Sequence, residues 1–190
     1  MEIGARPRSL SRPGDDLDAA VLAAVARGDE MALRQLWERH APSVHGYLRA
    51  ICDDDILAEE LLQDTFAAVW RAARSFSGRA SVRTWIFGIA RRRARDGRRR
   101  KQLDLRGGAE PDDLAPGPST EEAALARVEL AELAAHIRAL RPLHREVLAL
   151  AFSHELTHSE IALVLGVPIG TVKSRINAAR HALVEKTRER

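Results

Sequence analysis

The sequence predicts an all-α protein made of two small helical domains joined by a flexible linker, with a helix-turn-helix in the second domain. Apolar residues recur at helical spacing through residues 18–94 and again through 121–183. Between these stretches, residues 101–120 carry Gly, Pro and acidic side chains without an apolar core. No segment shows the alternating pattern of a strand. We therefore expect a tail at 1–16, domains at 17–100 and 121–190, and a linker at 101–120.

Composition indicates a globular chain without a membrane-spanning segment. Of the 190 residues, 45% are hydrophobic and 30% are charged, and no apolar run reaches the roughly 18 residues that a spanning helix needs. The N-terminal segment lacks the apolar centre of a signal peptide and is expected to be disordered. Cys52 is the single cysteine and is expected to be a buried small side chain. We expect a cytoplasmic protein without cofactor or metal, and no membrane insertion.

Four helices are expected in the first domain. They cover residues 18–28, 29–52, 56–73 and 80–99, and the second of them is expected to break or bend near Pro42. The third carries one buried apolar stripe, made of Leu57, Leu61, Leu62, Phe66 and Val69. In the second domain, helices are expected at 121–140 and 142–153, before the helix-turn-helix.

The last helix of the first domain is strongly basic. Eight cations and one acid lie between Arg91 and Lys101, although the net charge of the whole chain is only +3. Arginines 91, 95 and 98 lie opposite the apolar side, and Trp85 lies at the edge of that side. Arginines beside an aromatic ring suit single-stranded DNA, because they bind phosphates while the ring stacks on a base. The alternatives are a solvated helix end, and a core role for Trp85 and Phe76.

The helix-turn-helix is predicted from local signals between Thr157 and Leu183. Thr157 and Glu160 have the spacing of a capping box, Gly166 fits a helix C-cap, and Pro168 fits the first residue of the next helix. In that helix an apolar stripe (Val172, Ile176, Ala179, Leu183) lies opposite a polar face (Lys173, Ser174, Asn177, Arg180, His181), with Arg175 on the flank. This layout is typical of a helix that enters the DNA major groove; the alternative is an ordinary amphipathic surface helix.

The same stretch contains a competing motif. Residues 154–158 read HELTH, which matches the H-E-x-x-H pattern of zinc proteases. That chemistry requires both histidines on one continuous helix. Because Thr157 looks like the start of a helix, we expect no metal site here.

The chain resembles a compact alternative sigma factor of bacterial RNA polymerase, of the extracytoplasmic-function (ECF) group. VARGDEMALRQLWERHAPSVHGYL is similar to the opening helices of that group. ILAEELLQDTFAAVW resembles the segment that binds the clamp coiled coil of the polymerase largest subunit, and SVRTWIFGIARRRARDGRRR resembles the segment that melts and reads the minus-ten element. The C-terminal helix-turn-helix resembles the domain that reads the minus-thirty-five element. These similarities occur in order along nearly the whole chain.

The resemblance implies three binding surfaces. The polymerase-binding residues would be Glu59, Glu60, Leu62, Gln63, Asp64 and Phe66, of which the apolar ones could equally belong to the core. The minus-ten residues would be Phe76, Ser77, Arg79, Arg83, Trp85, Arg92 and Arg95. The minus-thirty-five residues would be Thr171, Lys173, Ser174, Arg175, Asn177 and Arg180. The implied partners are core RNA polymerase, promoter DNA and an anti-sigma factor, and the linker 101–120 would thread the polymerase channel.

The sequence departs from the family pattern at three places, one of which is Leu57, where a small or polar residue is common. Ala178 stands where a second basic residue is usual in the recognition helix, and Ala58-Glu59-Glu60 replaces the usual Asp-Asp pair. The departure at Ala178 leaves the promoter sequence unpredicted. No appended regulatory module is expected after Leu183.

Two other functions remain as alternatives. A stand-alone helix-turn-helix regulator would need a dimer surface and two half-sites. A protein that only docks helices on a partner would need neither. We expect a non-catalytic specificity subunit whose two domains move on their tether until polymerase spaces them.

Overall fold

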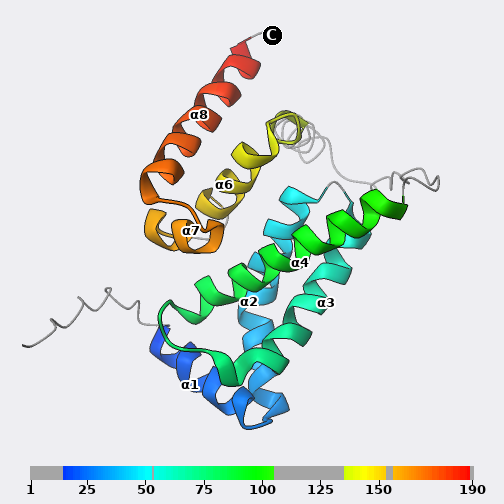
Figure 1. Cartoon of the computed structure of the whole chain (residues 1–190), viewed down its shortest axis with the longest axis vertical. Coiled ribbons are helices and arrows are strands. Elements are labelled where there is room, and N and C mark those ends of the chain that lie inside the picture. The colour runs from blue at the N-terminus through cyan, green and yellow to red at the C-terminus, as the bar shows by residue number, and fades with distance from the viewer. Residues whose placement is uncertain (1–14, 53, 105–134, 153–155, 189–190) are drawn as a thin grey trace, which may run out of the picture.

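The computed structural model describes residues 15–52, 54–104, 135–152 and 156–188, and its regular elements are all helical, as predicted. The elements are α1 (Asp15–Ala26), α2 (Glu30–Ile51), α3 (Asp55–Ala72), the 3-10 turn η1 (Ala73–Ser75), α4 (Val82–Asp104), α6 (Pro142–Phe152), α7 (His158–Leu165) and α8 (Ile169–Arg188). Helices α1 to α4 form one bundle, and α6 to α8 form a smaller group beside it (Figure 1). Residues 1–14 of the expected tail, and most of the expected linker and of the helix at 121–140, lie outside the described residues. The last two residues of the expected tail, Asp15 and Asp16, belong to α1, which begins earlier than the predicted start at residue 18.

Local capping sets several helix boundaries close to those predicted. The Asp29 carboxylate accepts from the Ala32 N–H at 3.1 Å, and the Asp54 carboxylate accepts from the Leu57 N–H at 3.0 Å. Each satisfies an N–H that the first turn leaves without a helical partner. Helix α4 continues to Asp104, past the expected linker start at 101.

The sequence predicts that the second helix breaks or bends near Pro42, and a break does not occur there. Helix α2 runs without interruption from Glu30 to Ile51. Proline lacks the N–H that would bond the carbonyl four residues earlier. Pro42 is exposed, so that carbonyl lies on the solvent side, where water can satisfy it. Packing of the opposite, buried face of α2 then holds the helix together.

The first bundle is closed around large buried side chains. Tyr47 of α2 meets Phe87 of α4 edge-on, with ring centroids 5.5 Å apart, and Trp37 meets Phe66 at 4.7 Å. Cys52 is buried, as predicted. Such aromatic pairs add to the stabilisation that burial of their area supplies.

A buried polar cluster fixes α1 on α2. Asp18 accepts from His40 Nε2 at 2.8 Å and from Arg39, and both Asp18 and His40 are buried. Burial lowers the pKa of His40 below its usual value of 6.5, despite the nearby Asp18 carboxylate, and Arg83 and Arg39 lower it further. Burial therefore favours the neutral form of His40, which donates to a carboxylate that also has an arginine partner.

The close approach of α3 and α4 depends on Gly97. A Cβ added at Gly97 would lie 2.9 Å from Leu61 Cδ2, and Leu61 is buried. This distance is shorter than carbon atoms tolerate, so the absence of a side chain lets the two helices meet there.

The second group of helices packs directly on the first. Helix α6 has two apolar sides: Leu148 packs with Leu140 and Ala179, whereas Val147 and Leu150 join the core that continues into α2 and α4. Helix α7 contacts α4, and α3 lies on the side of α4 away from α6 to α8 (Figure 1). The expectation of two freely moving domains therefore differs from the structure, which packs them around a shared core.

Candidate polymerase and promoter interfaces

The helix-turn-helix has the predicted local geometry. Thr157 Oγ1 accepts from the Glu160 N–H at 3.3 Å, and the Glu160 carboxylate accepts from the Thr157 N–H at 2.8 Å, which completes the capping box. Gly166 ends α7 in the left-handed conformation, with φ 65°, which only glycine adopts at little cost. The Pro168 carbonyl accepts from Thr171 and Val172, so α8 starts at Ile169, one residue later than predicted.

Helix α8 presents a polar face away from the core. Val172, Ile176 and Ala179 are buried. The predicted minus-thirty-five residues lie on the other faces: Lys173, Ser174, Asn177 and Arg180 are exposed, and Thr171 and Arg175 are half-buried. Ser174 also donates to the Thr171 carbonyl at 3.0 Å. Ala178 is also exposed, so a methyl group stands at the position where the family pattern has a second basic residue.

The geometry excludes the zinc-protease reading of residues 154–158. Helix α6 ends at Phe152 and α7 begins at His158, and Thr157 has an extended backbone between them. The two histidine positions therefore do not share one helix, which the zinc motif requires. His154 and Glu155 themselves lie outside the described residues.

The predicted minus-ten residues gather around the start and the outer face of α4. Phe76 and Trp85 contact each other edge-on, with ring centroids 5.3 Å apart, and both are half-buried, so each combines a core contact with an accessible edge. Gly78 turns the loop between them with φ 68°. Among the other predicted minus-ten residues, the exposed ones are Ser77, Arg79, Arg92 and Arg95. Arg83 is half-buried.

The predicted polymerase-binding segment is α3, and its residues divide into two sets. Leu62 and Phe66 are only 8% and 3% exposed, and Phe66 packs on Trp37, so their side chains serve the core in the free chain. The polar members, Glu59, Glu60, Gln63 and Asp64, are exposed. The polar residues therefore form the exposed surface of α3. The buried apolar residues pack α3 onto the rest of the bundle and so fix which side of the helix faces outward.

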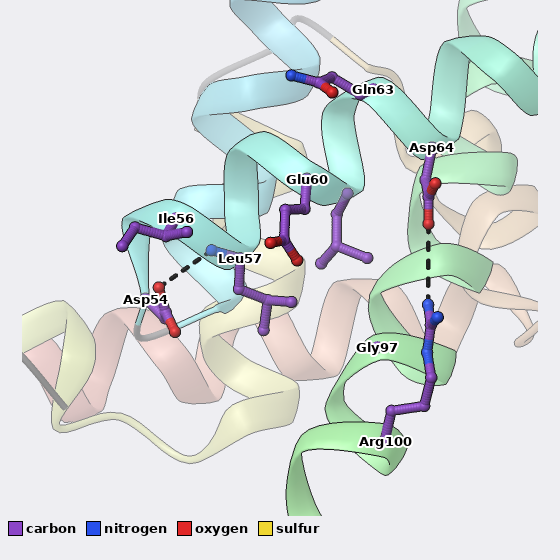
Figure 2. A pocket seen from close by; sticks show the side chains of 9 residues that line it. Asp54, Ile56, Leu57, Glu60, Gln63, Asp64, Gly97 and Arg100 are labelled. Atoms are coloured by element: carbon purple, nitrogen blue, oxygen red, sulfur yellow. Dashed lines mark hydrogen bonds and ion pairs between the residues drawn. The ribbon is translucent and has the colours of Figure 1, made fainter. Parts of the chain in front are cut away.

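Beside this surface, a cavity of about 560 Å³ opens between α3 and α4. Figure 2 shows Arg100 of α4 extended toward Asp64 of α3, with 3.8 Å between Nη2 and Oδ2. Both side chains are exposed, so this ion pair adds little stability. Leu57 and Glu60 line the cavity, and Ile56 stands at its margin with 63% of its surface exposed.

Sequence reasoning missed Ile56 and Arg100. Ile56 is the first residue of the amphipathic helix that the sequence predicts. From the sequence alone, an exposed isoleucine at that position looks the same as an isoleucine that packs in the core. Arg100 is one of many arginines in its helix, so the sequence does not single it out. Its partner Asp64 lies on a different helix, so their pairing is visible only in the structure. No local pattern could have identified either residue as part of this surface.

Two family models match the chain. Sigma-70 region 2 matches residues 36–103, and Sigma-70, region 4 matches residues 137–185. Together the matches cover more than half of the sequence and include both sets of exposed cations described above. The chain belongs to the sigma-70 family. The resemblance deduced from the sequence is thereby confirmed.

Relatives place this sigma factor in the ECF group. It is 40% identical to the ECF RNA polymerase sigma factor RpoE of Cereibacter sphaeroides, over 80% of this chain and 83% of that one. It is 32% identical to the RNA polymerase sigma factor NccH of Alcaligenes xylosoxydans xylosoxydans, over 88% and 92% of the two chains. The protein is thus an alternative sigma factor that directs transcription initiation.

Solved structures agree in fold. CnrH in complex with the cytosolic domain of CnrY superposes with a TM-score of 0.70, 27% identity, and coverage of 90% of this chain and 97% of that one. RpoE of Bartonella quintana, in complex with the anti-sigma factor NepR, gives a TM-score of 0.68 at 23% identity, covering 80% and 94%, and supports the fold alone. Among the helices described for this sigma factor, none combines the length and the apolar character needed to span a bilayer.

Proposed function

We propose that this sigma factor divides promoter recognition among three surfaces. The exposed polar side of α3 binds core polymerase, the loop before α4 and the arginine face of α4 capture the unpaired minus-ten strand, and the polar face of α8 reads the minus-thirty-five duplex. The observation that carries the proposal is the distribution of the exposed charged groups over different helices: acids on α3, and cations on α4 and α8.

The chemistry of each surface matches its proposed ligand. Glu59, Glu60 and Asp64 can pair with basic side chains of a protein partner, which sets orientation and association rate. Arg92 and Arg95 can hold phosphates while Trp85 accepts a base by stacking. Lys173, Asn177 and Arg180 are long or amide side chains of the kind that reach base edges and phosphates in the major groove.

In this proposal the protein supplies no catalytic group, because the polymerase makes the phosphodiester bonds. Base capture offsets part of the cost of opening the duplex, for which stacking averages about 1.4 kcal/mol per base-pair step. Residues 17–100 and 121–190 are the two working domains, and we assign the protein to the cytoplasm, bound to the nucleoid when polymerase holds it.

An anti-sigma factor is a proposed further partner. Support comes from CnrH, the similar protein of known structure, which is bound there to the cytosolic domain of CnrY.

The test is promoter-directed transcription by reconstituted enzyme. Core polymerase, purified protein and genomic DNA fragments are incubated together, and the 5′ ends of the RNA are mapped. We expect defined start sites that core polymerase alone does not produce. Protein that binds DNA but leaves the start sites unchanged would instead be a stand-alone regulator.

A further inference from the structure

A second cavity, of about 240 Å³, lies where the two groups of helices meet, and we call it the interdomain cavity. The end of α2, one side of α4 and the start of α6 line it. Its charged residues are Arg91, Arg95 and Arg98 of α4, and Arg145 and Glu146 of α6. Glu146 is the only acid among the described residues that line it. The balance of charge around this cavity therefore favours an anion.

The Glu146 carboxylate is already engaged by other groups. Its Oε1 accepts from Arg91 Nε at 2.8 Å and from the Tyr47 hydroxyl at 3.2 Å. In the part of the chain that the structure describes, no carboxylate forms an ion pair with Arg95 or Arg98. Both of these arginines are exposed, so an ion from solution can reach them. Two positive charges at the cavity are thus left for an external anion to neutralise.

Arg145 adds a buried guanidinium group to the cavity. Its exposed fraction is only 4%, and it donates to the Arg138 carbonyl at 3.2 Å and to the Ile51 carbonyl at 3.5 Å. These carbonyls hold the guanidinium group in place and bring no net charge of their own. A side chain that is already held in place loses less conformational entropy when it binds a ligand.

The N-terminus of α6 borders the same cavity. Pro142 and Leu143, the first two residues of this 11-residue helix, line it, and the first turn of α6 contains no acid. The first turn of a helix has N–H groups without helical partners and carries the positive end of the helix dipole, so it attracts anions. The helix terminus and the arginine side chains therefore favour the same kind of ligand.

We propose that the interdomain cavity binds a small anion with two linked phosphate groups, held by Arg95 and Arg98, by Arg145 and by the N-terminus of α6. Arg95 and Arg98 are about 4.5 Å apart along the axis of α4, so one compact anion can contact both. Arginine suits this ligand, because its planar group donates to two phosphate oxygens at once. The cavity is smaller than the roughly 300–1,000 Å³ of sites for drug-sized molecules, so it suits a pyrophosphate group. This site goes beyond the promoter and polymerase surfaces proposed above and does not depend on them.

The first experiment titrates the full chain with inorganic pyrophosphate in a calorimeter at constant ionic strength. We expect saturable binding, and Arg98→Gln should weaken it at least about tenfold, as for the loss of one charge-assisted hydrogen bond. The matched control is Arg99→Gln, which should keep the parent affinity, because Arg99 is exposed on the same helix and does not line the cavity. Binding that does not saturate, or an equal loss in both variants, would reflect only general attraction to a basic protein and would overturn the proposal.

A second pair of variants tests whether α6 borders the site. Leu143→Glu adds a carboxylate at the cavity, which competes with the anion for the arginines, so pyrophosphate affinity should fall at least about tenfold. Leu163→Glu makes the same change of charge on α7, away from the cavity, and should keep the parent affinity. The two leucines are 49% and 61% exposed, so both variants should fold. An unchanged affinity in Leu143→Glu would overturn the placement of the anion between α4 and α6.

The choice of ligand distinguishes two sources of the phosphate groups. Pyrophosphate and ADP carry the same linked pair, so an ADP affinity equal to or below that of pyrophosphate identifies an inorganic anion. A higher affinity for ADP identifies a nucleotide whose sugar and base lie outside the cavity, and both results support the site. Sulfate has a single tetrahedral group and should bind more weakly than pyrophosphate; equal binding would overturn the proposal. Circular dichroism during thermal unfolding checks every variant, and Arg95→Gln replaces Arg98→Gln if the latter does not fold.

Discussion

Thr84 and Glu160 are 76 residues apart in sequence, and the Thr84 hydroxyl donates to the Glu160 carboxylate at 3.1 Å. The other oxygen of this carboxylate accepts from the Thr157 N–H and completes the capping box of α7. One side chain therefore both caps the start of α7 and contacts the start of α4 in the other group of helices. Local folding of α7 and docking of the two domains are coupled through it.

This relationship predicts a measurable coupling between the two residues. In a double-mutant cycle of Thr84→Val and Glu160→Gln, we expect an interaction free energy of about 0.5–3 kcal/mol, the range for residues in direct contact. Chemical denaturation of the full chain gives the four values. The pair Asp29→Ala and Thr84→Val is the control, because Asp29 caps α2 and not α7. A cycle that closes to zero would mean that the domains are apart in the free protein.

Trp85 is predicted to act in promoter opening rather than in polymerase binding. Trp85→Ala removes the ring that is available for stacking, which is worth about 1–3 kcal/mol per base. Open-complex formation, followed by permanganate reactivity, should fall by about fivefold or more, while affinity for core polymerase stays within twofold of the parent. Trp70→Ala, at another half-buried tryptophan, is the control. Equal losses in both assays would assign Trp85 to the core.

Ile56 is predicted to contact polymerase. It is 63% exposed beside the cavity between α3 and α4, so Ile56→Glu should leave stability within about 0.5 kcal/mol. Affinity for core polymerase should fall by about tenfold, as for a residue near the centre of an interface. Met31→Glu is closely matched, because Met31 is 62% exposed and does not line this cavity. The same loss for both variants would point to general repulsion.

Arg180 is predicted to bind a phosphate at the minus-thirty-five duplex. Arg180→Ala should weaken the duplex complex and reduce the slope of log K against log salt by about 0.9, because one fewer counterion is released. Arg141→Ala, exposed in the same domain before α6, should leave the slope unchanged. Fluorescence anisotropy at several salt concentrations supplies both values. An unaltered slope for Arg180→Ala would remove this residue from the DNA surface.

His40 is predicted to make stability depend on pH. Its pKa is lowered in the folded state, so below about pH 6.5 the unfolded chain binds more protons than the folded one. The contribution of neutral His40 to the free energy of unfolding is therefore present above that pH. As pH falls, the free energy of unfolding decreases by up to about 1.4 kcal/mol per pH unit. His40→Gln should flatten this dependence between pH 7 and 5, whereas His181→Gln, at an exposed position of α8, should not. Urea denaturation across this range would reveal the difference.

Local chemistry made much of the fold predictable. Asp29, Asp54, Thr157 and Gly166 set helix ends through groups three or four residues away, so the sequence was sufficient to place them. The family motifs are equally local, because each lies within one helix and its preceding turn. The break expected at Pro42 failed because packing of the buried side of α2 outweighs one missing hydrogen bond.

The division of α3 into core and surface required the tertiary structure. Leu62 and Phe66 share a helix with Glu59 and Asp64, but only the packing against α2 and α4 shows which side chains are covered. The cavity beside Ile56 likewise depends on tertiary structure, because Ile56 and Gly97, which both line it, lie on different helices.

By itself, the sequence determined helix type, helix ends, the order of the motifs and hence the family, because these depend on neighbours along the chain. Only the tertiary structure decided that the two domains meet. Arg91 and Glu146 are 55 positions apart, and either could have faced water. What brings them together is the burial of apolar surface on both sides of α6, a collective effect that no spacing of residues encodes.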